Sequence, residues 1–201
     1  YLRHGGREMK LRLFRPEGAG PFPAVVDLHG GAWNTGSLEN CTARDEALCA
    51  AGFAVAALDF RQGPDFQHPA GSADVAAAVR WVRLNAARLE ADPQRIALIG
   101  SSSGGHLALL AALRPDHPDH MGTPIADRNG AFATHNDISA EVDYVVAMWP
   151  VSDPAARYRY AQRSSQDTLV DMTNRYFKDE DAMWDASIPR IVTSGEAGAG
   201  A

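Results

Sequence analysis

A single serine stands at the centre of the residues best suited to covalent chemistry. The segment Arg95–Leu107 reads R-I-A-L-I-G-S-S-S-G-G-H-L, an apolar stretch, a turn of small residues and a second apolar stretch. Its centre is G-x-S-x-G, the pattern of a nucleophile elbow, in which a sharp strand-to-helix turn exposes a serine hydroxyl. Gly100 and Gly104 lie where the two backbones would cross closely, so the spacing selects Ser102 among the three adjacent serines.

A second motif, H-G-G-A-W at residues 29–33, follows the apolar stretch Ala24–Leu28. Enzymes that transfer acyl groups stabilise an oxyanion with backbone N–H groups. Gly30, Gly31 and Ala32 lack bulk and would let the backbone approach a substrate closely. The other donor in such enzymes is the N–H of the residue after the nucleophile, which here is Ser103.

The two large side chains of this motif have different expected roles. We expect His29 to brace the loop by hydrogen bonding, because the chemistry needs backbone N–H groups at this place. Trp33 would either line the substrate pocket or pack in the core, and the sequence does not decide between them.

Together these motifs resemble those of the α/β-hydrolase superfamily. They are most similar to its esterase and lipase group, which includes the hormone-sensitive-lipase-like esterases, feruloyl and acetyl-xylan-type esterases and kynurenine formamidases. The resemblance continues in four further segments: Asp59–Arg61, Ala77–Asn85, Asp92–Ile96 and Trp149–Pro154. It implies Ser102 as the nucleophile and Gly31, Ala32 and Ser103 as the oxyanion donors.

The chain departs from this family's patterns at two places. Ala32 replaces the last glycine of the usual H-G-G-G, and serines replace the Asp and Ala beside the nucleophile in the usual G-D-S-A-G-G. Neither change removes a backbone donor.

The rest of a catalytic triad is missing from its expected place. In this fold the acid and then the histidine follow the serine along the chain. After Ser102 the only histidines are His106, His117, His120 and His135, and all precede the expected strand Val142–Trp149. We therefore expect the acid and the histidine to lie beyond residue 201. The alternatives are an inactive truncated chain, or an unusual geometry that uses an earlier histidine, of which His135 is the best candidate. We interpret Asp153, which precedes Pro154, as a turn residue.

Alternating strand and helix patterns predict an α/β fold with a mostly parallel sheet and helices on both faces. The expected strands are 10–15, 24–28, 54–60, 96–99 and 142–149, and the expected helices are 38–51, 72–89 and 107–113. Ser72 is the expected N-cap of the second helix. Because ligands bind at the carboxyl ends of such strands, Ser102 and Trp149 should meet there. Trp149 is therefore a second candidate pocket residue.

Composition limits the class of protein. With 201 residues and 45% hydrophobic residues, the chain is expected to form one α/β-hydrolase domain, incomplete at the C-terminus. Residues 153–187 are charged and aromatic, and form either a helical cap over the substrate or an ordinary helix pair. The net charge of −6 argues against a nucleic-acid partner, and no apolar stretch is long enough to span a bilayer.

The sequence contains no cofactor motif and no cluster of metal ligands. Cys41 and Cys49, expected on one helix about 12 Å apart, would be free thiols, and with no visible signal peptide we expect a cytoplasmic protein.

The resulting hypothesis is a serine hydrolase that cleaves small-molecule carboxylic esters through an acyl-enzyme on Ser102. Two alternatives remain, an amidase or formamidase on the same scaffold and a non-catalytic domain that keeps the pocket for binding.

Overall fold

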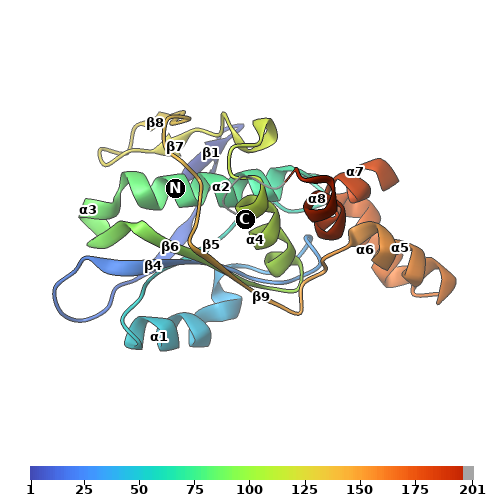
Figure 1. Cartoon of the computed structure of the whole chain (residues 1–201), viewed down its shortest axis with the longest axis horizontal. Helices are drawn as coiled ribbons and strands as arrows, with labels where there is room; N and C mark the ends of the chain where they lie inside the picture. The colour runs from blue at the N-terminus through green and yellow to red at the C-terminus, as the bar shows by residue number, and fades with distance from the viewer. Residues whose placement is uncertain (197–201) are drawn as a thin grey trace.

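A five-stranded sheet forms the centre of the protein (Figure 1). The computed structural model describes residues 1–196. The strand order is β3 (Leu11–Phe14), β5 (Ala54–Leu58), β4 (Phe22–Leu28), β6 (Ala91–Ser101) and β9 (Tyr144–Met148). Only β3 is antiparallel to its neighbour, so the predicted mostly parallel sheet is confirmed.

Helices cover both faces of this sheet. Figure 1 shows α1 (Thr42–Ala50) on one face and α2 (Ala70–Leu84) and α4 (Ser103–Leu113) on the other. A short 3₁₀ helix, η1 (Leu38–Cys41), leads into α1. The fold class expected from the alternating pattern is therefore correct.

The start of α2 differs from the prediction. The helix begins at Ala70 after the N-cap residue Pro69, and the Ser72 hydroxyl, already inside the first turn, donates to the Pro69 carbonyl at 2.9 Å. Ser72 is therefore not the N-cap. The expected helix 72–89 is also interrupted at Asn85, after which the short helix α3 (Ala86–Leu89) follows. The sequence does not distinguish an N-cap serine from a serine inside the first turn, because in both places the hydroxyl can bond to a nearby backbone group.

A second, small sheet lies on the outer side of α2 (Figure 1). Its order is β2 (Arg7–Met9), β1 (Leu2–His4), β7 (Ile125–Ala126) and β8 (Phe132–Ala133). Leu2 pairs with Ile125, and both side chains are buried in the core. The polar insert 114–141, which also contains the 3₁₀ helix η2 (Pro118–His120), is thus anchored to the N-terminal hairpin.

The last part of the described chain is helical. It contains α5 (Pro154–Arg163), α6 (Asp167–Tyr176), α7 (Glu180–Asp185) and α8 (Ile188–Ser194). In Figure 1, α5, α6 and α7 lie together at one end of the molecule, and α8 lies beside α4. None of the helices within residues 1–196 has the length and apolar character needed to cross a membrane.

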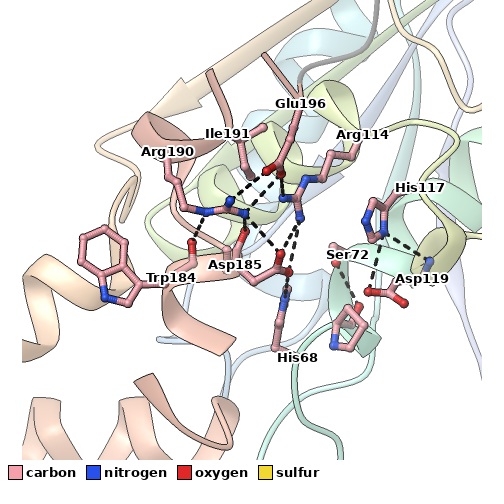
Figure 2. Close-up of polar contacts among 12 residues, drawn as sticks. His68, Ser72, Arg114, His117, Asp119, Trp184, Asp185, Arg190, Ile191 and Glu196 are labelled. Atoms are coloured by element: carbon pink, nitrogen blue, oxygen red, sulfur yellow. Dashed lines mark hydrogen bonds and ion pairs between the residues drawn. The ribbon is translucent and has the colours of Figure 1, made fainter. Parts of the chain in front are cut away.

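A network of charged side chains joins α7 and α8 to the end of α4 (Figure 2). Arg114 contacts Asp185 at 3.2 Å and Glu196 at 2.5 Å, and Arg190 contacts the same two carboxylates. His68 approaches Asp185 on the other side at 3.3 Å. The guanidinium of Arg114 is almost fully buried, so these carboxylates stabilise a charge that would otherwise be costly.

Candidate active site

The strand β6 turns directly into α4 at Ser102. The backbone of Ser102 has φ 54° and ψ −119°, a conformation that non-glycine residues rarely adopt and that costs about 1–3 kcal/mol. The turn is held on both sides, because the Ser102 N–H donates to the Met148 carbonyl at 3.0 Å and the Val151 N–H donates to the Ser102 carbonyl at 3.3 Å. The Ser102 residue is partly buried and remains partly accessible.

The glycines of the motif are required by close backbone contacts. A Cβ on Gly100 would lie 2.5 Å from the backbone of Gly104. A Cβ on Gly104 would lie 2.3 Å from the carbonyl oxygen of His29. Both distances are far below contact, so the crossing of strand, helix and H-G-G loop leaves room only for hydrogen.

The H-G-G-A-W loop packs directly on this turn. A Cβ on Gly30 would lie 3.4 Å from Cβ of Ser102, so no side chain separates the two segments. Within residues 1–196 the N–H groups of Gly31 and Ala32 make no hydrogen bond. Ser103 is the first residue of α4, so its N–H has no partner within the helix. Three backbone N–H groups, those of Gly31, Ala32 and Ser103, thus lie in the two contacting segments without a hydrogen-bond partner among residues 1–196.

Positive φ angles shape this loop. Gly31, Ala32 and Trp33 have φ of 128°, 49° and 64°, and the Gly31 carbonyl accepts from the N–H groups of Asn34 and Thr35. For Ala32 and Trp33 the left-handed conformation costs about 1–2 kcal/mol each. Ala32, in place of the family's usual glycine, therefore keeps its backbone N–H donor but adds backbone strain. The sequence did not predict this strain.

His29 has the bracing role expected of it. Its Nδ1 donates to the Gly30 carbonyl at 2.7 Å, and its ring stacks on Phe60 with centroids 4.4 Å apart. Burial lowers the pKa of His29, which favours the neutral ring.

Trp33 packs in the core, so its proposal as a pocket residue is wrong for this structure. The side chain is 1% exposed, stacks on Tyr176 at 5.7 Å and contacts Phe177 edge-on at 5.1 Å. Its large apolar surface is buried by the end of α6 and is not open to a ligand. Trp149, in contrast, is 75% exposed at the carboxyl end of β9, next to the elbow.

Two of the histidines after Ser102 have other partners, since His106 donates to the Ala186 carbonyl and His120 to the Arg114 carbonyl, both at 2.8 Å. His106 and His120 are buried, and burial lowers their pKa to about 3 and about 4. His135 follows β8, which lies on the outer side of α2 (Figure 1). No hydrogen bond joins the Ser102 hydroxyl to a histidine within the described range. Asp153 is the N-cap of α5 and accepts from the Ala156 N–H at 2.9 Å, which agrees with its interpretation as a turn residue.

One histidine–carboxylate contact could not be predicted from any pattern in the sequence. His68 and Asp185 are far apart along the chain and meet only because α7 lies beside the loop before α2. His68 and Arg114 together hold the pKa of Asp185 well below its usual range. Because Asp185 is shared with two arginines, the pair belongs to the network in Figure 2 that holds the last helices in place.

Comparison with known proteins identifies the family. The BD-FAE family model matches residues 11–194, which is nearly the whole chain. The chain belongs to the BD-FAE family. With its sheet and elbow, this BD-FAE chain is an α/β-hydrolase of the esterase and lipase group.

Relatives of this BD-FAE chain include proteins named for ester hydrolysis. The chain is 44% identical over 98 residues to carboxylesterase NlhH of Mycobacterium tuberculosis, covering 47% of this chain and 30% of the relative. It is 29% identical over 174 residues to ethyl acetate hydrolase of Pseudomonas putida, covering 83% and 48%. The structure of Thermogutta terrifontis esterase 2 with butyrate bound superposes with a TM-score of 0.69 at 25% identity, covering 92% and 63%. The BD-FAE chain thus spans 30% and 48% of the lengths of these two curated relatives.

Proposed function

We propose that this protein is a serine hydrolase that cleaves carboxylic esters of small molecules. Ser102 Oγ would attack the ester carbonyl carbon, and the tetrahedral oxyanion would accept hydrogen bonds from the N–H groups of Gly31, Ala32 and Ser103. Collapse expels the alcohol and leaves an acyl-enzyme, which water then hydrolyses to the acid and free serine. The observation that carries this proposal is the strained, partly accessible Ser102 in direct contact with a loop in which the N–H groups of Gly31 and Ala32 make no hydrogen bond within residues 1–196.

The start of α4 favours this chemistry. Ser102 precedes the first residue of the helix, where unpaired N–H groups and the positive end of the helix dipole favour developing negative charge. Each donor of this kind contributes about a hundredfold or more to the rate of acyl transfer.

The general base and its acid are proposed to lie beyond residue 201. Two observations support this. In the part of the chain that the structure describes, β9 has a neighbour on one side only, and its Tyr144 and Val146 are 74% and 51% exposed. The chain also spans only 63% of the esterase 2 structure that it resembles. Further strands beside β9 would cover this surface and bring an acid and a histidine to the carboxyl edge of the sheet, next to Ser102.

The helices of residues 153–187 are proposed to act as a cap over the substrate. They contact the loop of residues 29–34, which carries the proposed donors Gly31 and Ala32 and is called the oxyanion loop below. The Asn34 side chain donates to the Met172 carbonyl in α6 at 2.7 Å. Trp149, which precedes this segment in the chain, is the proposed pocket residue.

A cytoplasmic location is proposed as well, supported by the free thiols of Cys41 and Cys49.

Ester hydrolysis is favoured over amide hydrolysis by the relatives' names. Those relatives are named as carboxylesterase, carboxylic ester hydrolase and ethyl acetate hydrolase. A formamidase activity is the second candidate, because the same nucleophile and donors serve both reactions. Comparing the hydrolysis of short p-nitrophenyl esters with that of N-formylkynurenine by the complete protein separates the two.

Replacing one serine at a time tests the proposal. In the complete protein, Ser102→Ala should lower ester hydrolysis by roughly a millionfold, because the attacking oxygen is gone. Ser101→Ala is the matched control, since it changes the neighbouring hydroxyl and should retain most of the activity. Equal activity of Ser102→Ala and wild type would refute the proposal. A wild type with no hydrolase activity at all would favour the non-catalytic binding domain.

A further inference from the structure

A buried hydrogen bond connects the two motifs of the site. Trp33 directly follows the proposed donor Ala32, and His106 lies one helical turn after Ser102 in α4. The indole N–H of Trp33 donates to Nδ1 of His106 at 3.1 Å, and the two rings meet edge-on with centroids 5.5 Å apart. Both side chains are completely buried.

The contacts of His106 define which nitrogen carries its proton. An indole N–H is only a donor, so Nδ1 must be the unprotonated nitrogen. Nε2 therefore carries the proton and donates to the Ala186 carbonyl, which follows α7, at 2.8 Å. Only one neutral tautomer makes both bonds. Burial keeps the ring in the neutral form, and His68 is the titratable group whose charge also disfavours its protonation.

The oxyanion loop is strained and needs a directional contact to hold it in place. Ala32 and Trp33 are held in the left-handed region, and the loop would lower its energy by relaxing to ordinary φ values. Packing against Tyr176 and Phe177 holds the Trp33 ring, but apolar contacts resist sliding and rotation only weakly. The hydrogen bond to His106 is directional and ties the loop to the helix that carries Ser102.

We propose that Trp33 and His106 are positioning residues for the oxyanion hole. Their hydrogen bond fixes the Ala32 N–H relative to Ser102, so it acts through the backbone donor and not by touching substrate. The inference rests on the proposed function. It predicts a specific effect on the chemical step, because a shift of about 1 Å in a catalytic group costs about a hundredfold in rate.

Two substitutions of His106 separate positioning from packing. The amide oxygen of Asn occupies the place of Nδ1 and can accept from Trp33, whereas the amide nitrogen of Gln occupies the place of Nε2 and retains only the bond to Ala186. In the complete protein, His106→Gln and Trp33→Phe should each lower kcat by about tenfold to a hundredfold with KM unchanged. His106→Asn should stay within a few-fold of wild type, and Trp33→Phe combined with His106→Gln should cost no more than either alone. Equal losses in the Asn and Gln variants, or a change in KM alone, would overturn the proposal.

Two measurements do not depend on activity. In the complete protein labelled with ¹⁵N-histidine, the His106 shifts should place the proton on Nε2 with no titration between about pH 5 and pH 8. A proton on Nδ1 would overturn the proposal. Hydrogen exchange of residues 30–34 should be faster in His106→Gln than in His106→Asn at equal thermal stability, and equal exchange would also overturn it. If the wild type hydrolyses no ester, the proposed function is wrong. The NMR and hydrogen-exchange measurements still test whether the Trp33–His106 hydrogen bond forms and restrains the loop.

Discussion

At the scale of single residues, the site contains two strained backbone conformations, and contacts with the surrounding structure offset their free-energy cost. Ser102 adopts a strained backbone conformation, and Ala32 occupies a left-handed position that usually belongs to glycine. The Ser102 conformation costs about 1–3 kcal/mol and that of Ala32 about 1–2 kcal/mol. The offset comes from neighbours in fixed places, among them the Met148 carbonyl, which accepts from Ser102, and the Gly31 carbonyl, which closes the loop. The G-x-S-x-G motif predicted the sharp turn at Ser102, but nothing in the sequence predicted the strain at Ala32, because the φ angle of an alanine cannot be read from its identity.

A buried carboxyl on the other face of the sheet gives the protein a pH-dependent stability. Asp45 is buried, and burial together with the neighbouring Asp27 raises its pKa from 3.8 to about 8. Asp27 itself accepts a two-pronged ion pair from Arg44, one contact being 2.6 Å. Asp45 is therefore the member of this cluster that holds a proton at neutral pH.

The sign of the effect follows from proton binding. Between about pH 4 and pH 8 the native state keeps a proton on Asp45 that the unfolded chain has released, so stability falls as pH rises through this range. Asp45→Asn cannot ionise and should make the free energy of unfolding less dependent on pH there. Urea unfolding of wild type and variant at several pH values measures this difference. Parallel pH profiles for the two proteins would contradict the assigned ionisation.

At the scale of elements, the strand–turn–helix unit of β6 and α4 was predictable because close packing leaves few residue types that fit. Gly100 and Gly104 stand where a Cβ would overlap backbone, and the apolar runs on both sides match a buried strand and a buried helix. The boundaries of α2 were not predictable. Ser72 bonds to the carbonyl three residues earlier from inside the helix, and the break at Asn85 interrupts an otherwise continuous apolar pattern.

The elbow geometry predicts a large effect for the smallest possible substitution. In Gly104→Ala the added methyl would lie 2.3 Å from the His29 carbonyl oxygen and 2.6 Å from that of Leu28, both of which are backbone atoms. The H-G-G loop would have to move away from Ser102. We expect a loss of about 1–3 kcal/mol in stability and of about a hundredfold in kcat. Thermal unfolding and ester hydrolysis measure both.

The matched control for this substitution is Ala112→Ser, a similarly small change in α4 away from the crossing. It should leave both quantities nearly unchanged. A Gly104→Ala protein with wild-type stability and activity would show that the loop and helix are not in the close contact described.

At the scale of the whole molecule, three distant segments meet at the carboxyl edge of the sheet. The loop after β4 carries Gly31, the turn after β6 carries Ser102, and the end of β9 carries Trp149. This convergence was predictable from topology, since parallel strands share one carboxyl edge. The contacts that hold the last helices were not, because the His68–Asp185 pair and the burial of Trp33 under Tyr176 join residues with no common sequence pattern. Packing of α6 on the loop made Trp33 a core residue.

The central claim is that Ser102 is the nucleophile of an ester hydrolase, and covalent labelling of the complete protein tests it most directly. After reaction with a fluorophosphonate, peptide mass spectrometry should find the phosphonyl group on Ser102 alone, and the label should disappear in Ser102→Ala and persist in Ser101→Ala. An unlabelled wild type, or a label on another residue that survives Ser102→Ala, would contradict the account.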